Sequence, residues 1–260
     1  MKRRDFLRDG FLATTGVLLS PKISFARVSV KPQKFLIIGA GLSGLVTAYE
    51  LNKLGHDVTI LEAQNRIGGR VLTWREPFAE NLYAEAGAAR IPFDHETTLK
   101  YVKEFNLPLI PFYSSTGKFI RLKNGKPQAV NWGKFADATD VVMQLEKPEY
   151  WHKIKGGNDQ FTDAFAEKLT GKIRLNSKVV KIEQDAKQVS VTSKENGNLE
   201  TITGDFSIIT IPLTVLRNVE FQPALSAAKQ EVIQKTKYDS ASRVFIETRR
   251  RFWEDSGLNG

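Results

Sequence analysis

The stretch KFLIIGAGLSGLVTAYELNKLGHDVTILEA, residues 34–63, decides the fold. It opens with a short apolar run, residues 35–38, of the kind that forms a strand buried on both faces. Apolar residues then recur at helical spacing up to Gly55, and a second apolar run, residues 58–61, follows. Strand, helix and strand in this order predict a βαβ unit with two neighbouring parallel strands.

A glycine-rich turn, GAGLSG at residues 39–44, joins the first strand to the helix and fits the pattern G-x-G-x-x-G. In this pattern the first glycine makes the tight turn, the second lets the backbone approach a pyrophosphate, and the third lets the helix pack on the strand. The helix N-terminus stabilises phosphate charge, and a carboxylate at the end of the second strand accepts hydrogen bonds from a ribose. The sequence therefore predicts a dinucleotide site formed by Gly39, Gly41, Leu42, Ser43, Gly44, Glu62 and Ala63.

The next residues narrow the choice of dinucleotide. Gly68-Gly69-Arg70 follows Glu62 closely, so that paired glycines admit a second close pass of the backbone and an arginine can neutralise a pyrophosphate. These residues resemble the E-x₅-G-G-R extension of FAD-binding amine oxidases and their relatives. The resemblance implies FAD as the cofactor, held in part by Gly69 and Arg70, while a surface arginine in a turn is the alternative for Arg70.

A run of small residues, AEAGAARIP at residues 84–92, carries one arginine. It is similar to the segment of flavin-dependent L-amino-acid oxidases in which Gly-x-x-Arg passes under the isoalloxazine ring. The resemblance implies that Gly87, Ala88 and Ala89 are small because the flavin lies against them. It also implies that Arg90 lies at the flavin and binds the α-carboxylate of the substrate through two hydrogen bonds. A local ion pair of Arg90 with Glu85 or Asp94 is the alternative.

The resemblance also implies a reaction. A hydride passes from the substrate Cα to FAD, molecular oxygen reoxidises the flavin to give hydrogen peroxide, and the imino acid hydrolyses to a 2-oxo acid and ammonia. No catalytic acid or base is assigned. Val179 matches the position whose backbone contacts the adenine, although an ordinary strand valine is the alternative. An amine or polyamine oxidase, a related flavin desaturase, or a truncated non-catalytic flavin-binding chain remain open as alternatives.

The fold class that we predict is α/β, with a Rossmann-like doubly wound FAD-binding sheet, a β-meander and an incomplete α+β substrate domain. The sequence predicts a hairpin around Asn124-Gly125, a helix from Asn158 or Asp159, and a meander with turns at residues 185–187 and 196–197. DFSIITIP then returns to the main sheet, and SRVFIETRRRFWEDSGLNG resembles a family strand followed by a Phe-Trp-Glu turn. The resemblance places further segments of the family fold, including a lysine near the flavin, beyond residue 260. The expected domains are 27–115, the first part of the FAD-binding domain; 116–157, a substrate-domain hairpin and shortened insertion; 158–215, the return to the FAD-binding domain; and 216–260, the start of a second substrate-domain segment.

The N-terminus, MKRRDFLRDGFLATTGVLLSPKISFA at residues 1–26, has the pattern of an export signal. Arg3-Arg4 precedes an apolar run, Phe11–Leu19, that is too short to cross a bilayer as a stable helix. The stretch resembles a bacterial twin-arginine signal peptide. We therefore expect cleavage after Ala26, recognition by the twin-arginine export machinery and a periplasmic or secreted protein, with a basic tail before a buried helix as the alternative.

Composition excludes several other classes. The 260 residues contain no cysteine, so disulfides, thiolate metal sites and cysteine nucleophiles are excluded. Three scattered histidines lack ligand spacing, so we expect no metal. The formal charge of +9 is dispersed among acidic residues, so we expect no nucleic-acid partner. The expected partners are a small amino acid or amine substrate and molecular oxygen, and a homodimer is left open.

Overall fold

The computed structural model describes residues 31–112, 119–130 and 151–256. The elements below belong to the compact unit Pro32–Gly260. The export signal expected at residues 1–26 lies outside the described residues, as does most of the shortened insertion. Within the described ranges, no helix is both long enough and apolar enough to cross a membrane. The domain boundaries expected within residues 27–260 stay predictions.

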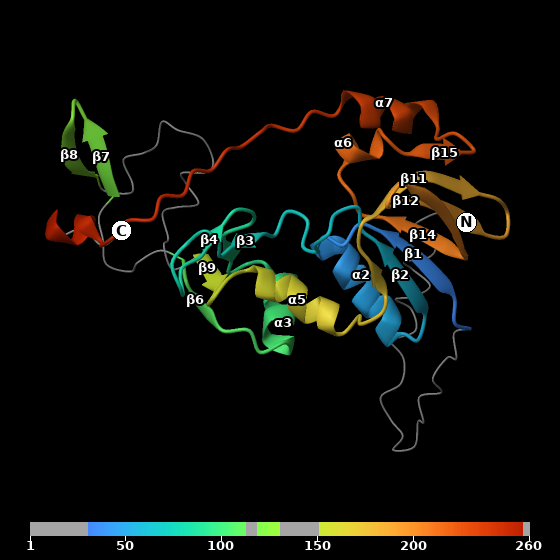
Figure 1. The fold of residues 1–260 in the computed structure, drawn as a ribbon, viewed down its shortest axis with the longest axis horizontal. Helices are drawn as coiled ribbons and strands as arrows, with labels where there is room; N and C mark the ends of the chain where they lie inside the picture. Colours follow the sequence, from blue (N-terminus) through green and yellow to red (C-terminus); the bar gives the residue numbers. More distant parts are fainter. Residues whose placement is uncertain (1–30, 113–118, 131–150, 257–260) are drawn as a thin grey trace, which may run out of the picture. The chain divides into compact units, whose positions relative to one another are not determined.

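The main sheet has four parallel strands in the order β10-β2-β1-β14. Figure 1 labels three of them, β2, β1 and β14. Helix α2 joins β1 to β2 and contacts both strands. This arrangement confirms the predicted βαβ unit and the return of DFSIITIP to the sheet, because β14 pairs with β1. The elements are β1 (Lys34–Ile38), α2 (Leu42–Lys53), β2 (Asp57–Leu61), β10 (Ile173–Arg174) and β14 (Phe206–Ile209).

One face of the main sheet is covered by helices. Ile37 of β1 packs in a buried cluster with Leu45 of α2 and with Phe165 of helix α5. Helix α3 adds Tyr101 to the same cluster. Helix α5 begins at the predicted position, and its bounds are Asp159–Glu167, while α3 spans Glu96–Glu104. The apolar face of α5 therefore has a partner in α2.

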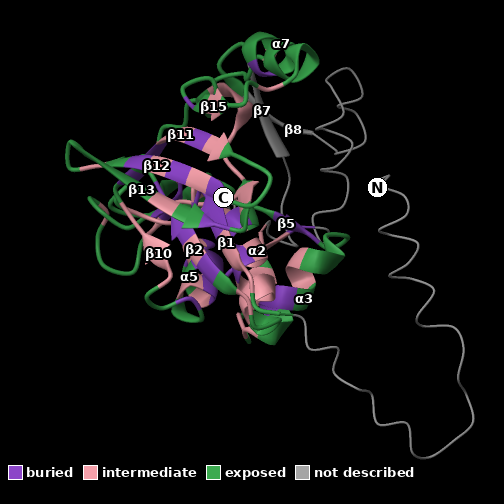
Figure 2. Cartoon of the chain, turned by 90° about the vertical axis from the view of Figure 1, so that its right-hand side faces the viewer, coloured by how far each residue is buried: buried purple, intermediate pink, exposed green. Residues whose placement is uncertain are grey.

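The other face of the sheet packs on the β-meander. Successive residues of a strand point to opposite faces, so Leu36 and Ile38 join a second cluster with Val191 of the meander. Both faces of β1 are thus buried, which explains its continuous apolar run. Figure 2 shows the buried residues concentrated in β1, β2, β11 and β12.

The predicted meander is confirmed. Its strands β11, β12 and β13 pair antiparallel in sequence order, and a short strand, β15, adds to β11 in parallel. The first turn is closed by the Asp185 carboxylate, which accepts hydrogen bonds from the main-chain N–H groups of Lys187 and Gln188 at 2.7 and 2.9 Å. The bounds are β11 (Ser177–Gln184), β12 (Val189–Glu195), β13 (Asn198–Gly204) and β15 (Glu220–Gln222).

The remaining strands of the described residues form three smaller sheets. The hairpin of β7 and β8 turns at Asn124 and Gly125, with φ of 51° and 74°, as predicted. β3 pairs with β4, and β9 pairs with both β5 and β6. The bounds are β3 (Thr73–Trp74), β4 (Ala84–Glu85), β5 (Ile91–Pro92), β6 (Leu109–Pro111), β7 (Phe119–Lys123), β8 (Lys126–Val130) and β9 (Trp151–Ile154).

The C-terminal part contains helices α6 (Leu213–Leu216) and α7 (Ala227–Lys235) and the 3₁₀ turn η4 (Phe252–Ser256). The Phe-Trp-Glu turn falls in η4 as expected. The strand expected just before it is wrong, because residues 236–248 have no regular secondary structure. A strand needs a neighbouring ladder, and this stretch pairs with no strand of the described residues. Its Val244 and Ile246 are 84% and 81% exposed.

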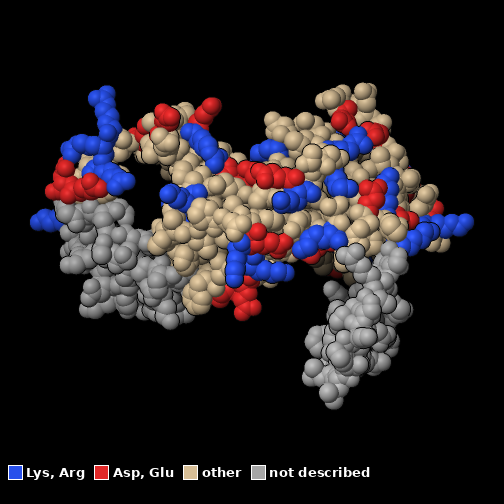
Figure 3. All heavy atoms as spheres, turned by 90° about the horizontal axis from the view of Figure 1, so that it is seen from below, with Lys and Arg blue, Asp and Glu red and all other residues tan. Residues whose placement is uncertain are grey.

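Charged side chains are mixed over the surface. Figure 3 shows Lys and Arg interspersed with Asp and Glu over the face that it presents, with no broad area of one sign. The described residues form ion pairs across this mixture, among them Arg75 with Asp159 at 2.5 Å and Lys172 with Asp57 at 3.8 Å.

Candidate functional site

The three glycines of the turn between β1 and α2 are glycines for different structural reasons. Gly39 has a φ of +103°, which an L side chain rarely adopts, and a Cβ at Gly44 would overlap the carbonyl oxygen of Gly39. At Gly41, by contrast, no atom of the described residues other than those of its immediate chain neighbours lies within 4 Å of the place that a Cβ would take. The chain itself therefore requires the first and third glycines, and Gly41 leaves open space outside the turn.

The open space lies at a helix N-terminus. Gly41 is the N-cap of α2, no side chain caps its N–H groups, and its first turn has no acidic residue. Leu42 and Ser43, two of the predicted site residues, begin the helix. Unsatisfied N–H groups and the helix dipole together favour an anion at such a place.

Glu62 connects this turn to the end of β2. Its side chain is 8% exposed, and one carboxylate oxygen accepts a hydrogen bond of 2.7 Å from the main-chain N–H of Ala40. The other oxygen accepts a hydrogen bond of 2.9 Å from the N–H of Gln64. A carboxylate offers about four acceptor positions, so Glu62 retains capacity for a ribose. Ala63, the next predicted residue, is exposed.

The second glycine pair runs alongside the first turn. Gly68 forms a parallel bridge with Gly41, and its N–H donates to the carbonyl oxygen of Ala40 at 2.8 Å. A Cβ at Gly69, whose φ is +57°, would lie 3.2 Å from the Cα of Gly41. The structure therefore brings Gly69 and Gly41 together, as the predicted site requires. Sequence reasoning missed Arg66, whose guanidinium donates to the carbonyl oxygens of Ile67 and Gly69 at 3.0 and 2.9 Å.

The small-residue loop packs on the residues that follow Gly69. The N–H of Gly87 donates to the carbonyl oxygen of Leu72 at 3.0 Å, and that of Ala88 to Arg70 at 2.9 Å. A Cβ at Gly87 would overlap the carbonyl oxygen of Arg70. The resemblance attributes the small size of Gly87 to a flavin, and the close approach of the chain to itself already requires a glycine there.

A pocket of about 780 Å³ lies where these segments meet. Its volume is in the range of small-molecule and cofactor pockets. It collects four predicted site residues, Gly69, Arg70, Gly87 and Ala88. The remaining lining residues are Leu72, Trp74, Ala86, Ala241, Arg243 and Phe245.

Arg90 follows this loop and lies on an aromatic ring. Its guanidinium carbon is 4.8 Å from the ring centroid of Trp151, which begins β9 next to Pro92 of β5. Arg90 is exposed. Both carboxylate oxygens of Glu85, one of the two alternative ion-pair partners of Arg90, accept hydrogen bonds from other residues.

Glu85 belongs to a buried polar network under the loop. It accepts hydrogen bonds from the Thr73 hydroxyl at 2.9 Å and from the N–H of Asn158 at 2.8 Å. The Asn158 side chain, which is 5% exposed, donates to the carbonyl oxygen of Ala88 at 2.9 Å. Burial raises the pKa of the Glu85 carboxyl above its ordinary value, and these two hydrogen bonds oppose the rise. Sequence reasoning identified Asn158 only as a helix start, because nothing local marks a contact with residue 88.

Val179 is the residue predicted to contact the adenine. It is 7% exposed and lies just before an irregularity in the pairing of β11 with β12, outside the pocket of about 780 Å³.

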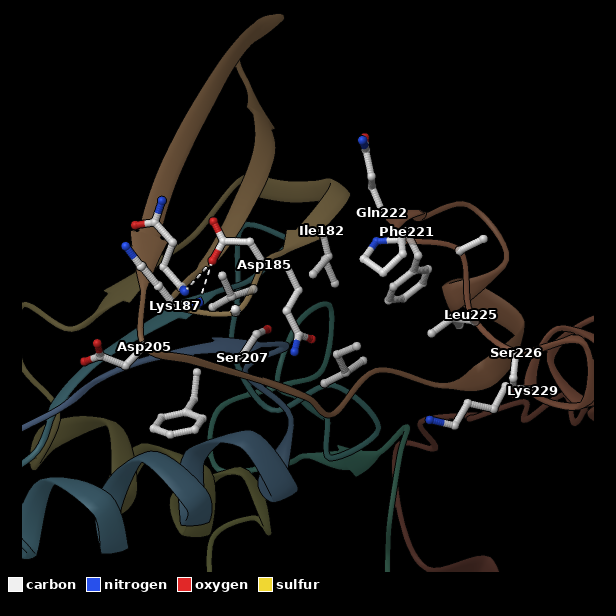
Figure 4. Close-up of a pocket in the computed structure, with 18 of the residues that line it drawn as sticks. Ile182, Asp185, Lys187, Asp205, Ser207, Phe221, Gln222, Leu225, Ser226 and Lys229 are labelled. Carbon is white, nitrogen blue, oxygen red and sulfur yellow. Dashed lines mark hydrogen bonds between the residues drawn. The ribbon is translucent and has the colours of Figure 1, made fainter. Parts of the chain in front are cut away.

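A second pocket, of about 640 Å³, lies between the β11–β12 turn, β14 and the segment leading to α7 (Figure 4). None of the predicted site residues lines it. The part of the chain that the structure describes holds no group of three His, Asp or Glu side chains placed for a metal ion.

The parallel sheet, the glycine turn with open space at Gly41 and the acceptor Glu62 define a dinucleotide-binding protein of Rossmann-like fold. Residues 42–147 and 134–260 match the family model of flavin containing amine oxidoreductases. The chain belongs to this family, and its cofactor is FAD.

Two curated relatives show how much of the family the chain spans. It is 30% identical to YobN of Bacillus subtilis (strain 168), provisionally named an L-amino-acid oxidase, over 89% of this chain and 67% of YobN. It is 28% identical to an L-amino acid oxidase of Cerastes cerastes, over 88% of this chain and 60% of that protein. The chain thus spans 60% to 67% of the length of these relatives.

Solved structures share the fold at low identity. Putrescine oxidase with putrescine bound aligns with a TM-score of 0.65 at 15% identity, over 78% of this chain and 63% of that one. Cyclohexylamine oxidase from Brevibacterium oxydans IH-35A aligns with a TM-score of 0.63 at 17% identity, over the same shares. These likenesses support the fold class that the sequence predicted.

Proposed function

We propose that the whole protein is an FAD-dependent oxidase of L-amino acids that yields 2-oxo acids, ammonia and hydrogen peroxide. The observation that carries this proposal is the position of Arg90, two residues after Ala88, which lines the pocket of about 780 Å³. A substrate with a carboxylate suits an arginine there. The names of the two curated relatives point to the same substrate class.

The residues of the first turn would hold the diphosphate half of the cofactor. Gly41 and the uncapped N-terminus of α2 would receive the pyrophosphate, Arg70 would neutralise it, and Glu62 would accept hydrogen bonds from the ribose. The small-residue loop would support the flavin. The proposed cofactor residues are Gly39, Gly41, Leu42, Ser43, Gly44, Glu62, Ala63, Gly69, Arg70, Gly87, Ala88, Ala89, Arg90 and Val179.

Bound FAD supplies the group that accepts a hydride. In our proposal, the task of Arg90 is to orient the substrate by its α-carboxylate. The contact of its guanidinium with Trp151 is compatible with this task, because a cation–π contact uses the charge whereas a carboxylate is bound through N–H donors. Trp151 would restrict the rotamers of Arg90 and so prepare it for binding.

The proposal is tested with the full protein under anaerobic conditions, by mixing it with an L-amino acid or with the matching amine that lacks the carboxylate. We expect the flavin absorbance to bleach rapidly with the amino acid and much more slowly with the amine. Bleaching by the amine alone would replace the proposal with amine or polyamine oxidation.

We also propose export by the twin-arginine route, on the basis of the Arg3-Arg4 pair. Replacing both arginines with lysine should leave uncleaved precursor in the cytoplasm, as cell fractionation and immunoblotting would detect. Normal delivery of that variant to the periplasm would contradict the proposal.

A further inference from the structure

The segment after α7 is fastened to the small-residue loop by an arginine. One terminal nitrogen of Arg243, Nη1, donates to the carbonyl oxygens of Glu85 and Gly87, at 2.6 Å each. These two carbonyls flank Ala86, so one guanidinium spans the part of the loop that leads to Ala88. Hydrogen bonds from a charged donor are stronger than those between neutral groups.

Alternate residues of the same segment make the other contacts. The ring of Phe245 meets that of Trp74 edge to face, with centroids 6.2 Å apart. The Glu247 carboxylate accepts a hydrogen bond of 3.1 Å from the N–H of Ala79. Arg243, Phe245 and Glu247 therefore face the earlier part of the chain together, and each contact supports the other two.

Arg243 also forms a wall of the pocket of about 780 Å³, together with Ala241 and Phe245. Arg70 lines the same pocket. Two arginines thus line one cavity. Reduction adds negative charge to a flavin, and a cation close to the ring stabilises the reduced form.

We infer that Arg243 is a positioning residue of the flavin site, which holds the loop of Glu85 and Gly87 in the position that the cofactor requires. This inference rests on the proposed placement of the flavin in the pocket, and it is independent of the substrate class. The Asn158 side chain also binds this loop, by donating to the carbonyl oxygen of Ala88. Arg243 binds the loop through the carbonyls of Glu85 and Gly87, and it is a charged residue that lines the pocket.

The test compares three variants of the full protein. Arg243→Met removes the donors and the charge at similar length, and Arg243→Lys retains the charge without the planar fork. Arg217→Met is the matched control, because the Arg217 guanidinium also donates to two main-chain carbonyls, those of Ile233 and Thr236, but does not line this pocket. The measurements are the Kd for FAD by fluorescence titration and the midpoint potential of the bound flavin.

We expect Arg243→Met to raise the Kd for FAD by about 10- to 100-fold, from the loss of hydrogen bonds by a charged donor. We also expect it to lower the midpoint potential. Arg243→Lys should raise the Kd less and keep the potential close to that of the parent protein. Arg217→Met should lower the Tm and leave both the Kd and the potential unchanged.

An unchanged Kd and potential in Arg243→Met would overturn the inference, and so would an equal rise of the Kd in Arg217→Met. If Arg243→Met does not fold, Arg243→Lys decides, because a Kd equal to that of the parent would show that the fork is dispensable. A protein that oxidises amines in place of amino acids would refute the proposed substrate and leave these results standing.

Discussion

The carboxylate of Glu62 accepts a hydrogen bond from the main-chain N–H of Ala40 across 2.7 Å, in a buried position. The end of β2 is thereby tied to the glycine-rich turn that follows β1. The same side chain is proposed to bind the ribose, so one carboxylate would serve both the fold and the cofactor.

Glu62→Ala should lower the free energy of unfolding by about 1.5–3 kcal/mol, because it removes a charged acceptor from the buried N–H of Ala40 and the partly buried N–H of Gln64. It should also weaken FAD binding. Urea denaturation and FAD titration measure the two effects. Asp205→Ala is the control, since Asp205 accepts a hydrogen bond of 2.7 Å from the N–H of Lys34 in an exposed position. It should cost about 1 kcal/mol or less and spare FAD binding, and equal effects of the two variants would contradict this reading.

Gly41 and Gly44 should respond to substitution in opposite ways. Gly41→Val should fold with a loss of less than about 1 kcal/mol, because its φ of −71° suits an L residue and its side chain would meet open space. It should abolish FAD binding, because the side chain would occupy the approach of the pyrophosphate. Gly44→Ala should destabilise the fold by about 1–3 kcal/mol through overlap with the carbonyl of Gly39. Thermal unfolding and FAD fluorescence separate the two outcomes, and full FAD affinity in Gly41→Val would place the pyrophosphate elsewhere.

Arg90→Ala in the full protein should lower kcat/KM for L-amino acids by roughly 30- to several-thousand-fold, the equivalent of about 2–5 kcal/mol for one partner of a desolvated charge pair. The flavin should stay bound, because the pyrophosphate contacts are elsewhere. Arg90→Lys should rescue only part of the loss, since a point charge cannot reproduce the fork. The matching amines are the control substrates and should be oxidised as before. Equal losses for both substrates would assign Arg90 to the support of the flavin or the fold.

Glu85 should make stability fall as the pH rises. Its pKa is raised in the folded state, so the folded state binds the proton more tightly than the unfolded state does. The resulting stabilisation is complete below the ordinary pKa of a glutamate, about 4.3, and is lost as the pH rises through the higher folded value. Urea denaturation of the parent and of Glu85→Gln across this range should give a difference in the free energy of unfolding that changes with pH. A difference that stays constant would show that Glu85 does not titrate in this way.

Local sequence patterns were sufficient to predict the half of the site around Gly41 and Glu62. The glycine spacing, the helix periodicity and the apolar runs each act over a few residues, so the sequence displays them directly. The loop at Gly87 was placed by resemblance, and the packing reason for its glycine lies in the carbonyl of Arg70, which no local pattern reveals. Arg243 was missed for the same reason, because its hydrogen bonds join residues far apart in the chain.

The same contrast has a consequence for the order of folding. Ala40 and Glu62 are 22 residues apart, whereas Arg243 and Glu85 are 158 apart. Closing the longer loop costs more chain entropy, and contacts of low sequence separation form faster. We therefore expect the βαβ half of the site to fold before Arg243 reaches the loop at Gly87, which pulsed hydrogen exchange would reveal as earlier protection of the amides of β1 and α2. A nucleotide could then be captured by a half-formed site, and the cofactor itself would help to recruit the rest of the chain.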